Sequence, residues 1–454
     1  MDVKQLKEYR TKLYTDLYTN VIPDRVPVSD AFAIEFFLQY AGKDLMISQY
    51  SLSVELLEEV LDKAMEFAKG DTMSLGAARN AVGIMFQKSR VNVMSKTGFI
   101  QHPEVSILSA DEYDEYISNP HEYTLSVLQP RANRGWDADP VIRCMNFAKF
   151  MLSQLEHNRM IAEANRKHAE KYGLYITPPG VTGRMPIPFD TLADMNRGFT
   201  EIVKDIKRRP QKVLDALEAL MPYCIWQASK SKAHPLGSNT VMTHMGAFLR
   251  TKEFEKFYWP TFEKLVHITA QRGQQTTIFC EHDWTRFVDY LQDLPQGTRI
   301  FMEYGDPQVF KDKLGKKLVL GGFYPIALLK SGTKQQCIDK AKELLDILAP
   351  GGNYYFCFDK SALQLSDINV ENYVAVMEFV LENYKYENAG EKVSSVKKED
   401  TIRDYSNQYP EFKSKYIIDF DDFIADYPPA DEKAIPFMRA AYEKYSAIVD
   451  PFFS

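Results

Sequence analysis

Short β-rich segments alternate with helix-like segments from about residue 173 to residue 384, and this alternation is the feature that most constrains the fold of the chain. The β-rich segments are GLYITPP (173–179), SNTVMTH (238–244), TTIFCE (276–281), RIFMEY (299–304), LVLGGF (318–323) and YYFCF (354–358). Amphipathic segments lie between them, as expected for βαβ units and a parallel sheet. At least six such strands predict an α/β fold of the (β/α)₈ TIM-barrel type. A doubly wound open sheet is less favoured, because no glycine-rich phosphate-binding turn follows any of these strands.

The rest of the chain is predicted to add a helical segment at the N-terminus and an extension at the C-terminus. Helices are expected over 1–20, 52–70 and 139–172, the last one capped by Asp139 before Pro140. Residues 85–108 have a strand-like pattern. The predicted barrel domain therefore covers 1–390. Residues 391–454 form a charged, Pro- and Tyr-rich extension that packs on the barrel or on a partner subunit.

Composition limits the classes of partner. The net charge is −7 and the pI is about 5.8, so no broad basic field is available for nucleic acid. The basic run at 204–212 is typical of a solvated helix end. No window approaches the roughly 18 consecutive apolar residues of a membrane span, and the N-terminus lacks a secretory apolar region. The five cysteines are scattered, as expected for reduced thiols in a cytoplasmic protein.

Polar side chains follow the apolar runs at several strand ends, where a parallel barrel places its active site. These residues are His244, the run Cys280-Glu281-His282-Asp283-Trp284, Glu303 with Asp306, and Cys357 with Asp359. Thiolate, imidazole and carboxylate are zinc ligands, so the run at Cys280 could supply half of a metal site, completed by His244 or Cys357.

Structural roles compete with each of these interpretations. The cysteines could be small buried apolar residues. Glu281 and Asp283 could cap the following helix, and Asp190 could do the same before TLADMNRGF or face the pocket. Arg184, in a Pro- and Gly-rich loop, could meet an acidic ligand or solvent.

A series of motifs in this order resembles the uroporphyrinogen decarboxylase-like superfamily over about residues 20–385. The motifs are IPDRVPV, DEYDEYISNP, FDTLADMNRGF with DIKRRPQKV, FEKFYWP, FCEHDWTRFVDYLQDLPQG, FMEYGD, LVLGGFYPIALLKSGT and GGNYYFCFD. The resemblance implies a (β/α)₈ barrel, in agreement with the alternation of strands and helices.

Two branches of this superfamily imply different chemistry. The decarboxylases bind a carboxylated tetrapyrrole with N-terminal arginines, but the matching region here, DAFAIEFFLQYAGKDLMIS, contains none. The corrinoid-linked methyltransferases hold zinc with an H-x-C pair and a distant cysteine. By motif order these cysteines correspond to Cys280 and to a position near Cys357. Ile278 occupies the histidine position, so Glu281 or His244 would replace that ligand.

The resemblance therefore implies a methyltransferase component of an anaerobic, corrinoid-dependent methyl-transfer or O-demethylation system. The expected zinc ligands are His244, Cys280, Glu281 and Cys357. The expected catalytic residues are Glu281, Glu303 and Asp190, and the expected substrate-binding residues are Asp190, Arg184, Asp283 and Asp306. The expected partners are a small methylated substrate and a small corrinoid protein. Formation of a homodimer is left as an open alternative. Neither nucleic acid nor a membrane is expected as a partner.

Two alternatives stay open. The first is a metal-free, uroporphyrinogen decarboxylase-like lyase that acts on a carboxylated ring compound and uses Arg184 and Arg197. The second is a non-catalytic barrel that binds a corrinoid or tetrapyrrole.

Overall fold

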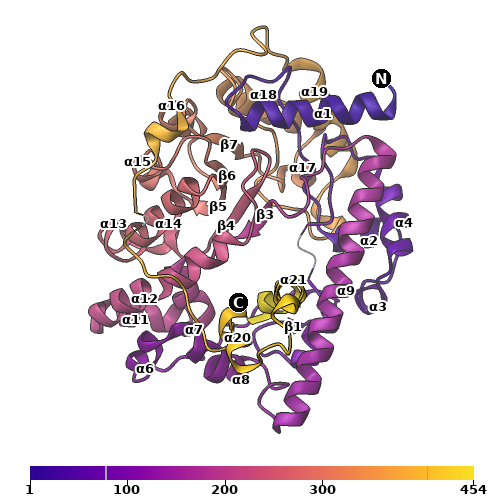
Figure 1. The fold of residues 1–454 in the computed structure, drawn as a ribbon. Coiled ribbons are helices and arrows are strands. Elements are labelled where there is room, and N and C mark those ends of the chain that lie inside the picture. Colours follow the sequence, from indigo (N-terminus) through magenta and orange to yellow (C-terminus); the bar gives the residue numbers. More distant parts are fainter. Residues whose placement is uncertain (77–78, 406, 454) are drawn as a thin grey trace.

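A parallel sheet of five strands lies at the centre of the computed structural model, which describes residues 1–76, 79–405 and 407–453 (Figure 1). Its order is β3-β4-β5-β6-β7. The strands are β3 (Thr182–Arg184), β4 (Ser238–Thr243), β5 (Thr276–Asp283), β6 (Arg299–Tyr304) and β7 (Val319–Gly322). Sequence order and spatial order coincide, so each strand lies beside the next one along the chain. The predicted α/β class with a parallel sheet is confirmed.

Helices connect the strands, as the alternation predicted. They are α10 (Pro188–Asp190), α11 (Phe199–Arg208), α12 (Pro210–Ser229), α13 (Thr251–Glu253), α14 (Trp259–Gln271), α15 (Val288–Leu291), α16 (Pro307–Leu314), α17 (Leu328–Ser331), α18 (Lys334–Leu348) and α19 (Val370–Asn383). Two π-helical segments, Thr191–Arg197 and Phe254–Tyr258, interrupt this series. Proline stands at the start of α12 and α16, where its missing N–H costs no helical hydrogen bond.

Isolated bridges continue the parallel arrangement beyond β7. Leu320 pairs with Tyr354, so the predicted strand at 354–358 lies next to β7 without forming a regular strand of its own. Phe356 pairs in turn with Val28. The strand predicted at 173–179 was wrong, since this segment is irregular and the first parallel strand is β3; its Tyr175 N–H donates to the Asp71 carbonyl at 2.8 Å. Closure into an eight-stranded barrel stays a prediction.

The N-terminal third is mainly helical. Its helices are α1 (Val3–Tyr18), α2 (Ile34–Tyr40), α3 (Leu45–Tyr50), α4 (Val54–Ala64), α5 (Ala81–Gln87), α6 (Tyr113–Ser118), α7 (Pro120–Tyr123), α8 (Gln129–Ala132) and α9 (Pro140–Tyr172). The predicted cap of α9 is confirmed, since the Asp139 carboxylate accepts the Val141 N–H at 2.9 Å. The strand prediction for 85–108 was largely wrong. Its first residues belong to α5, and only the short antiparallel pair β1 (Val93–Met94) and β2 (Ile100–Gln101) is extended.

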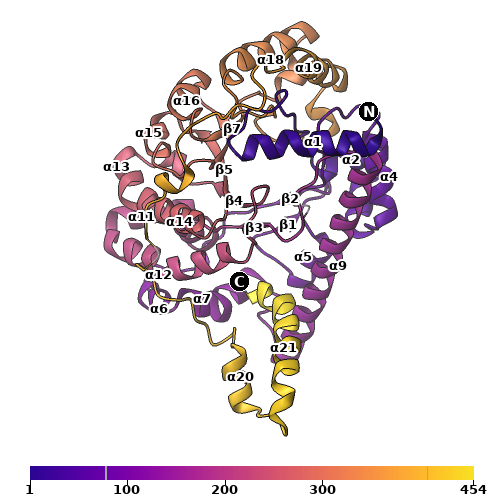
Figure 2. The ribbon, with the colours of Figure 1, turned by 45° about the horizontal axis from the view of Figure 1, so that its top comes forward.

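The C-terminal extension contacts two separate parts of the N-terminal half of the chain, the segment after α1 and helix α9. Lys392 forms a bridge with Val21, and the Phe452 ring lies 5.9 Å from Phe150 on α9. Two helices, α20 (Phe420–Asp426) and α21 (Ile435–Val449), lie side by side and project away from the sheet in Figure 2. None of the helices within the described residues is both long and apolar enough to cross a membrane.

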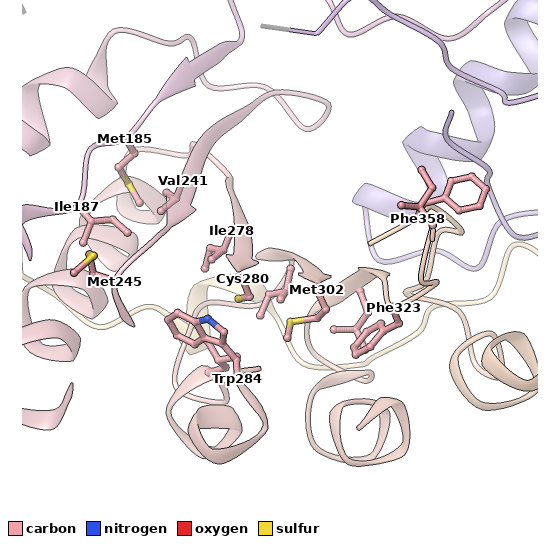
Figure 3. Close-up of a cluster of buried hydrophobic side chains, with 14 of the residues drawn as sticks. Met185, Ile187, Val241, Met245, Ile278, Cys280, Trp284, Met302, Phe323 and Phe358 are labelled. Carbon is pink, nitrogen blue, oxygen red and sulfur yellow. The ribbon is translucent and has the colours of Figure 1, made fainter. Parts of the chain in front are cut away.

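The hydrophobic core lies between the sheet and its covering helices. Side chains from successive strands meet there, including Val241 from β4, Ile278 and Cys280 from β5, and Met302 from β6 (Figure 3). Trp284, fully buried, packs in the same cluster. The helix-facing side chains of the strands thus form the core, and the opposite face of the sheet is left for other contacts.

Candidate active site

The sheet face opposite the core carries an apolar layer near the carboxyl ends of the strands. The register places Met242 beside Phe279, and Phe279 beside Phe301. The two phenyl rings stack with their centroids 4.7 Å apart. Met242 is 46% exposed, so this layer is open to solvent on the face that the core does not use.

One step further along the strands, a histidine and a carboxylate form a close pair. His244 follows β4 and Glu281 lies near the end of β5, and His244 Nδ1 is 3.0 Å from Glu281 Oε2. Both side chains reach solvent, His244 more than Glu281. The hydrogen bond to Glu281 raises the pKa of His244 to about 9, although partial burial opposes the shift. The imidazole is therefore held in its protonated form at neutral pH.

A β-bulge shapes the next strand end. The register between β5 and β6 shifts between Cys280 and Asp283, and His282 has a φ of 62°. This geometry turns the His282 N–H toward Glu303, whose Oε2 accepts it at 2.9 Å. Lys360 donates to the other Glu303 oxygen at 2.9 Å. Burial raises the pKa of Glu303, but these two donors outweigh it and lower that pKa below its usual value.

Asp190 lies behind this pair. Its carboxylate accepts the Met245 N–H and the Tyr258 hydroxyl, each at 2.9 Å. Burial raises the pKa of Asp190 to about 7, against the effect of both hydrogen bonds and of His244. Because Met245 follows His244 in the chain, Asp190 fixes the backbone beside the pair. The predicted contact of Asp190 with substrate stays a prediction. The burial of its carboxylate does not favour such a contact.

The two cysteines lie away from the mouth of the sheet. Cys280 is fully buried on the helix-facing side of β5, beside Trp284 (Figure 3). Burial raises the pKa of its thiol well above the ordinary range. Cys357 is also buried; its Sγ accepts the Gly322 N–H at 3.1 Å, and burial raises its pKa to about 12. Both thiols are in surroundings that disfavour the thiolate, the form that binds metal.

The four predicted zinc ligands therefore do not form one site. His244 and Glu281 are brought together, but Cys280, the neighbour of Glu281 in the strand, points to the opposite face. Among the described residues, no three His, Cys, Asp or Glu side chains lie close enough to hold a metal ion. These donors do not fit the predicted zinc centre.

The other predicted site residues differ in whether their side chains are free to contact a ligand. Arg184 lies on β3, in register with Thr240, and not in the predicted loop; its guanidinium is exposed and forms no hydrogen bond or ion pair with the described residues. Asp283 accepts the Thr285 N–H at 2.8 Å, and Asp306 caps α16. Arg197 is buried in an ion pair with Asp205, so the proposed role of Arg197 in a lyase pocket is wrong.

Two basic residues near this region, His102 and Arg79, were not predicted. His102 follows β2, and Arg79 donates to the Ile100 carbonyl of the same hairpin at 3.1 Å. Burial lowers the pKa of His102, and the cations Arg79 and His244 lower it further. His102 is thus close enough to His244 for the two charges to interact, although the two residues lie far apart in the chain and no local sequence pattern indicates it.

A surface pocket of about 600 Å³ adjoins this region. Its lining residues are Ala247, Phe248, His282, Asp283, Thr285 and Arg286. The Phe248 ring lies 4.6 Å from the His282 ring, so the pocket begins beside the bulge that holds Glu303. Phe248 is half exposed and gives this pocket an apolar wall.

Comparisons with known proteins agree with this architecture. Residues 162–382 match the family model for uroporphyrinogen decarboxylase (URO-D). This range includes all five parallel strands and the His244–Glu281 pair. Residues 162–382 thus match a uroporphyrinogen decarboxylase-like domain, and the resemblance predicted from the motifs is confirmed over this range.

A solved structure, a methyltransferase from Methanosarcina mazei, is similar to the chain with a TM-score of 0.52 and 12% sequence identity. The match covers 82% of this chain and 98% of that one. At this identity the likeness shows the fold alone, and together with the family match it implies a TIM barrel. No curated protein matches the chain.

Proposed function

We propose that the chain is the methyltransferase component of a corrinoid-dependent methyl-transfer or O-demethylation system. A small methylated substrate would bind at the carboxyl ends of the strands of a (β/α)₈ barrel. The observation that carries this proposal is the His244–Glu281 pair, held at 3.0 Å beside the open layer of Met242, Phe279 and Phe301. An apolar surface and a held proton donor together suit a substrate with an apolar body and one polar atom.

The His244–Glu281 pair supplies a proton donor, which the removal of a methyl group requires. When a methyl group leaves an oxygen or sulfur atom, the electron pair of the broken bond stays on that atom, which becomes basic. With Nδ1 hydrogen-bonded to Glu281, the second imidazole nitrogen of His244 can donate a proton there. A positioned general acid of this kind accelerates such reactions by roughly 10²- to 10⁴-fold.

The chain's own residues account for binding, orientation and proton delivery. A corrinoid, brought by a separate small protein, would supply the nucleophile that receives the methyl group. Glu303, held by His282 and Lys360, lies one strand away from the pair and can accept a hydrogen bond from the substrate.

Turnover with free cob(I)alamin tests the proposal. Purified protein would be mixed with a panel of aryl methyl ethers, methyl thioethers and methylamines, and methylcobalamin would be followed spectroscopically. We expect turnover with at least one donor and, at pH 8, a lower rate in Glu281→Gln, because His244 is then mostly deprotonated. Binding of a corrinoid with no turnover on any donor would instead support the non-catalytic alternative.

A metal-free lyase is the second candidate, and it rests on a different observation. Arg184 ends β3, its exposed guanidinium has no partner among the described residues, and Arg79 adds a second guanidinium beside the β1–β2 hairpin. These cations could bind the carboxylates of a ring substrate. Release of carbon dioxide from carboxylated pyrroles, lost in Arg184→Met and retained in Glu281→Gln, would favour the lyase.

A further inference from the structure

The opposite end of the sheet contains a buried arginine without an acidic partner. Arg299 begins β6 and is 5% exposed. Its Nη2 donates to the Pro235 carbonyl at 2.8 Å, while its Nε has no hydrogen-bond partner. No carboxylate lies within 4.0 Å of its guanidinium in the described part of the chain, although a guanidinium carries five N–H donors.

The other buried arginines differ in this respect. Arg25 is 2.5 Å from Asp71, and Arg197 is 2.7 Å from Asp205. Folded proteins pair buried charges because an unpaired buried cation is strongly destabilising. The isolation of Arg299 is therefore an exception within this protein and needs a physical reason.

The groups around Arg299 provide further donors but no anion. The Tyr18 ring of α1 stacks on the guanidinium at 3.5 Å, and the Tyr18 hydroxyl makes no hydrogen bond with the described residues. Lys398, from the C-terminal extension, lies near the start of β6, because Thr401 Oγ1 accepts the Gln296 N–H at 2.9 Å. Burial lowers the pKa of Lys398 to about 8, Arg299 lowers it further, and the adjacent Glu399 opposes both. The Lys398 ammonium also lacks an ion pair in the described structure.

We propose that Arg299, Lys398 and the Tyr18 hydroxyl form a binding site for a small oxyanion, a phosphate or a carboxylate group. Two oxygen atoms of such a group match the fork of a guanidinium, and its charge offsets both cations. The site lies at the amino ends of the strands, away from the His244–Glu281 pair, and it does not depend on the proposed function.

Thermal unfolding of the full chain tests this site without any activity assay. Sodium chloride would be replaced stepwise by sodium phosphate at constant ionic strength and pH 7.5. We expect a saturable rise in Tm, about 3 °C at a phosphate concentration one hundred times Kd. A parallel series with acetate distinguishes a general carboxylate site from one that prefers phosphate.

Three variants decide the assignment. Arg299→Met and Lys398→Met should abolish or strongly reduce the phosphate-dependent rise, whereas Lys397→Met, which changes an exposed neighbouring lysine, should retain it. If Arg299→Met does not fold, equilibrium dialysis with radiolabelled phosphate on the wild type and Lys398→Met gives the same comparison. An equal response in all variants, or no anion dependence in the wild type, would overturn the proposal.

Discussion

His244 Nδ1 and Glu281 Oε2 lie 3.0 Å apart at the ends of two adjacent parallel strands. Because Glu281 stabilises the imidazolium, Glu281→Gln should lower the pKa of His244 from about 9 toward its ordinary value near 6.5. NMR titration of the imidazole nitrogens measures this shift. His168 on α9, whose pKa is lowered by burial, serves as the internal control, and its pKa should not change.

The same pair predicts a pH dependence of stability. The pKa of His244 is raised in the folded state, so the pair stabilises the protein fully below about pH 6.5 and loses this effect as the pH rises through about 9. The difference in unfolding free energy between wild type and Glu281→Gln should therefore shrink over that range. Chemical denaturation at several pH values measures it, and a difference independent of pH would contradict the assigned protonation.

Asp190 should make stability depend on pH in the opposite direction to an ordinary ion-paired carboxylate, whose pKa is lowered by folding. Its folded-state pKa is raised from 3.8 to about 7, so the folded protein binds the extra proton and loses stability as the pH rises between these values. Asp190→Asn should reduce this slope by at most about 1.4 kcal/mol per pH unit. Asp30, whose pKa is also raised to about 7 by burial, keeps its own contribution in the variant. An unchanged slope would mean that Asp190 is ionised in the folded state.

Cys280 should behave as a core residue. Cys280→Ala removes one buried atom beside Trp284 and should cost about 1 kcal/mol of stability. Methyl transfer and the metal content of the protein should stay as in the wild type. Denaturation, the cobalamin assay and elemental analysis check these three outcomes. Loss of one bound zinc per chain in this variant would show that Cys280 is a metal ligand.

Lys360 should lower the pKa of the Glu303 carboxylate, which lies beside the β-bulge. Its ammonium donates to Glu303 at 2.9 Å and helps to lower the pKa of that group. Lys360→Met should raise the pKa of Glu303 and shift the acidic limb of the pH–rate profile to higher pH. Lys330→Met, which changes an exposed lysine on α17, is a matched control and should leave the profile unchanged.

The alternation of strands and helices was enough to predict the parallel sheet, and the polar strand ends predicted His244, Glu281 and Glu303 near one edge. The side of β5 on which Cys280 lies could not be predicted. In TTIFC both Ile278 and Phe279 are apolar, so the run has no polar–apolar alternation that distinguishes the helix-facing side from the open side.

The remaining residues near the site were not predicted because they reach it through contacts between distant parts of the chain. His102, beside a hairpin far away in the chain, is near enough to His244 to interact with its charge, and Lys360 reaches Glu303 from the segment after the last predicted strand. The β-bulge that turns His282 toward Glu303 adds one residue to β5. Such a local shift depends on how two strands pair, which the sequence of one strand does not reveal.

The pH dependence of kcat/KM for methyl transfer tests the role of His244 and Glu281 most directly. We predict that the wild-type rate falls as the pH rises through about 9, where His244 loses its proton, and that Glu281→Gln moves this fall toward pH 6.5. His244→Gln should be roughly 10²- to 10⁴-fold slower and lack this limb. Wild-type rates in Glu281→Gln and His244→Gln, together with loss of activity in Cys280→Ala, would contradict a proton donor at this pair and place the chemistry at the cysteine.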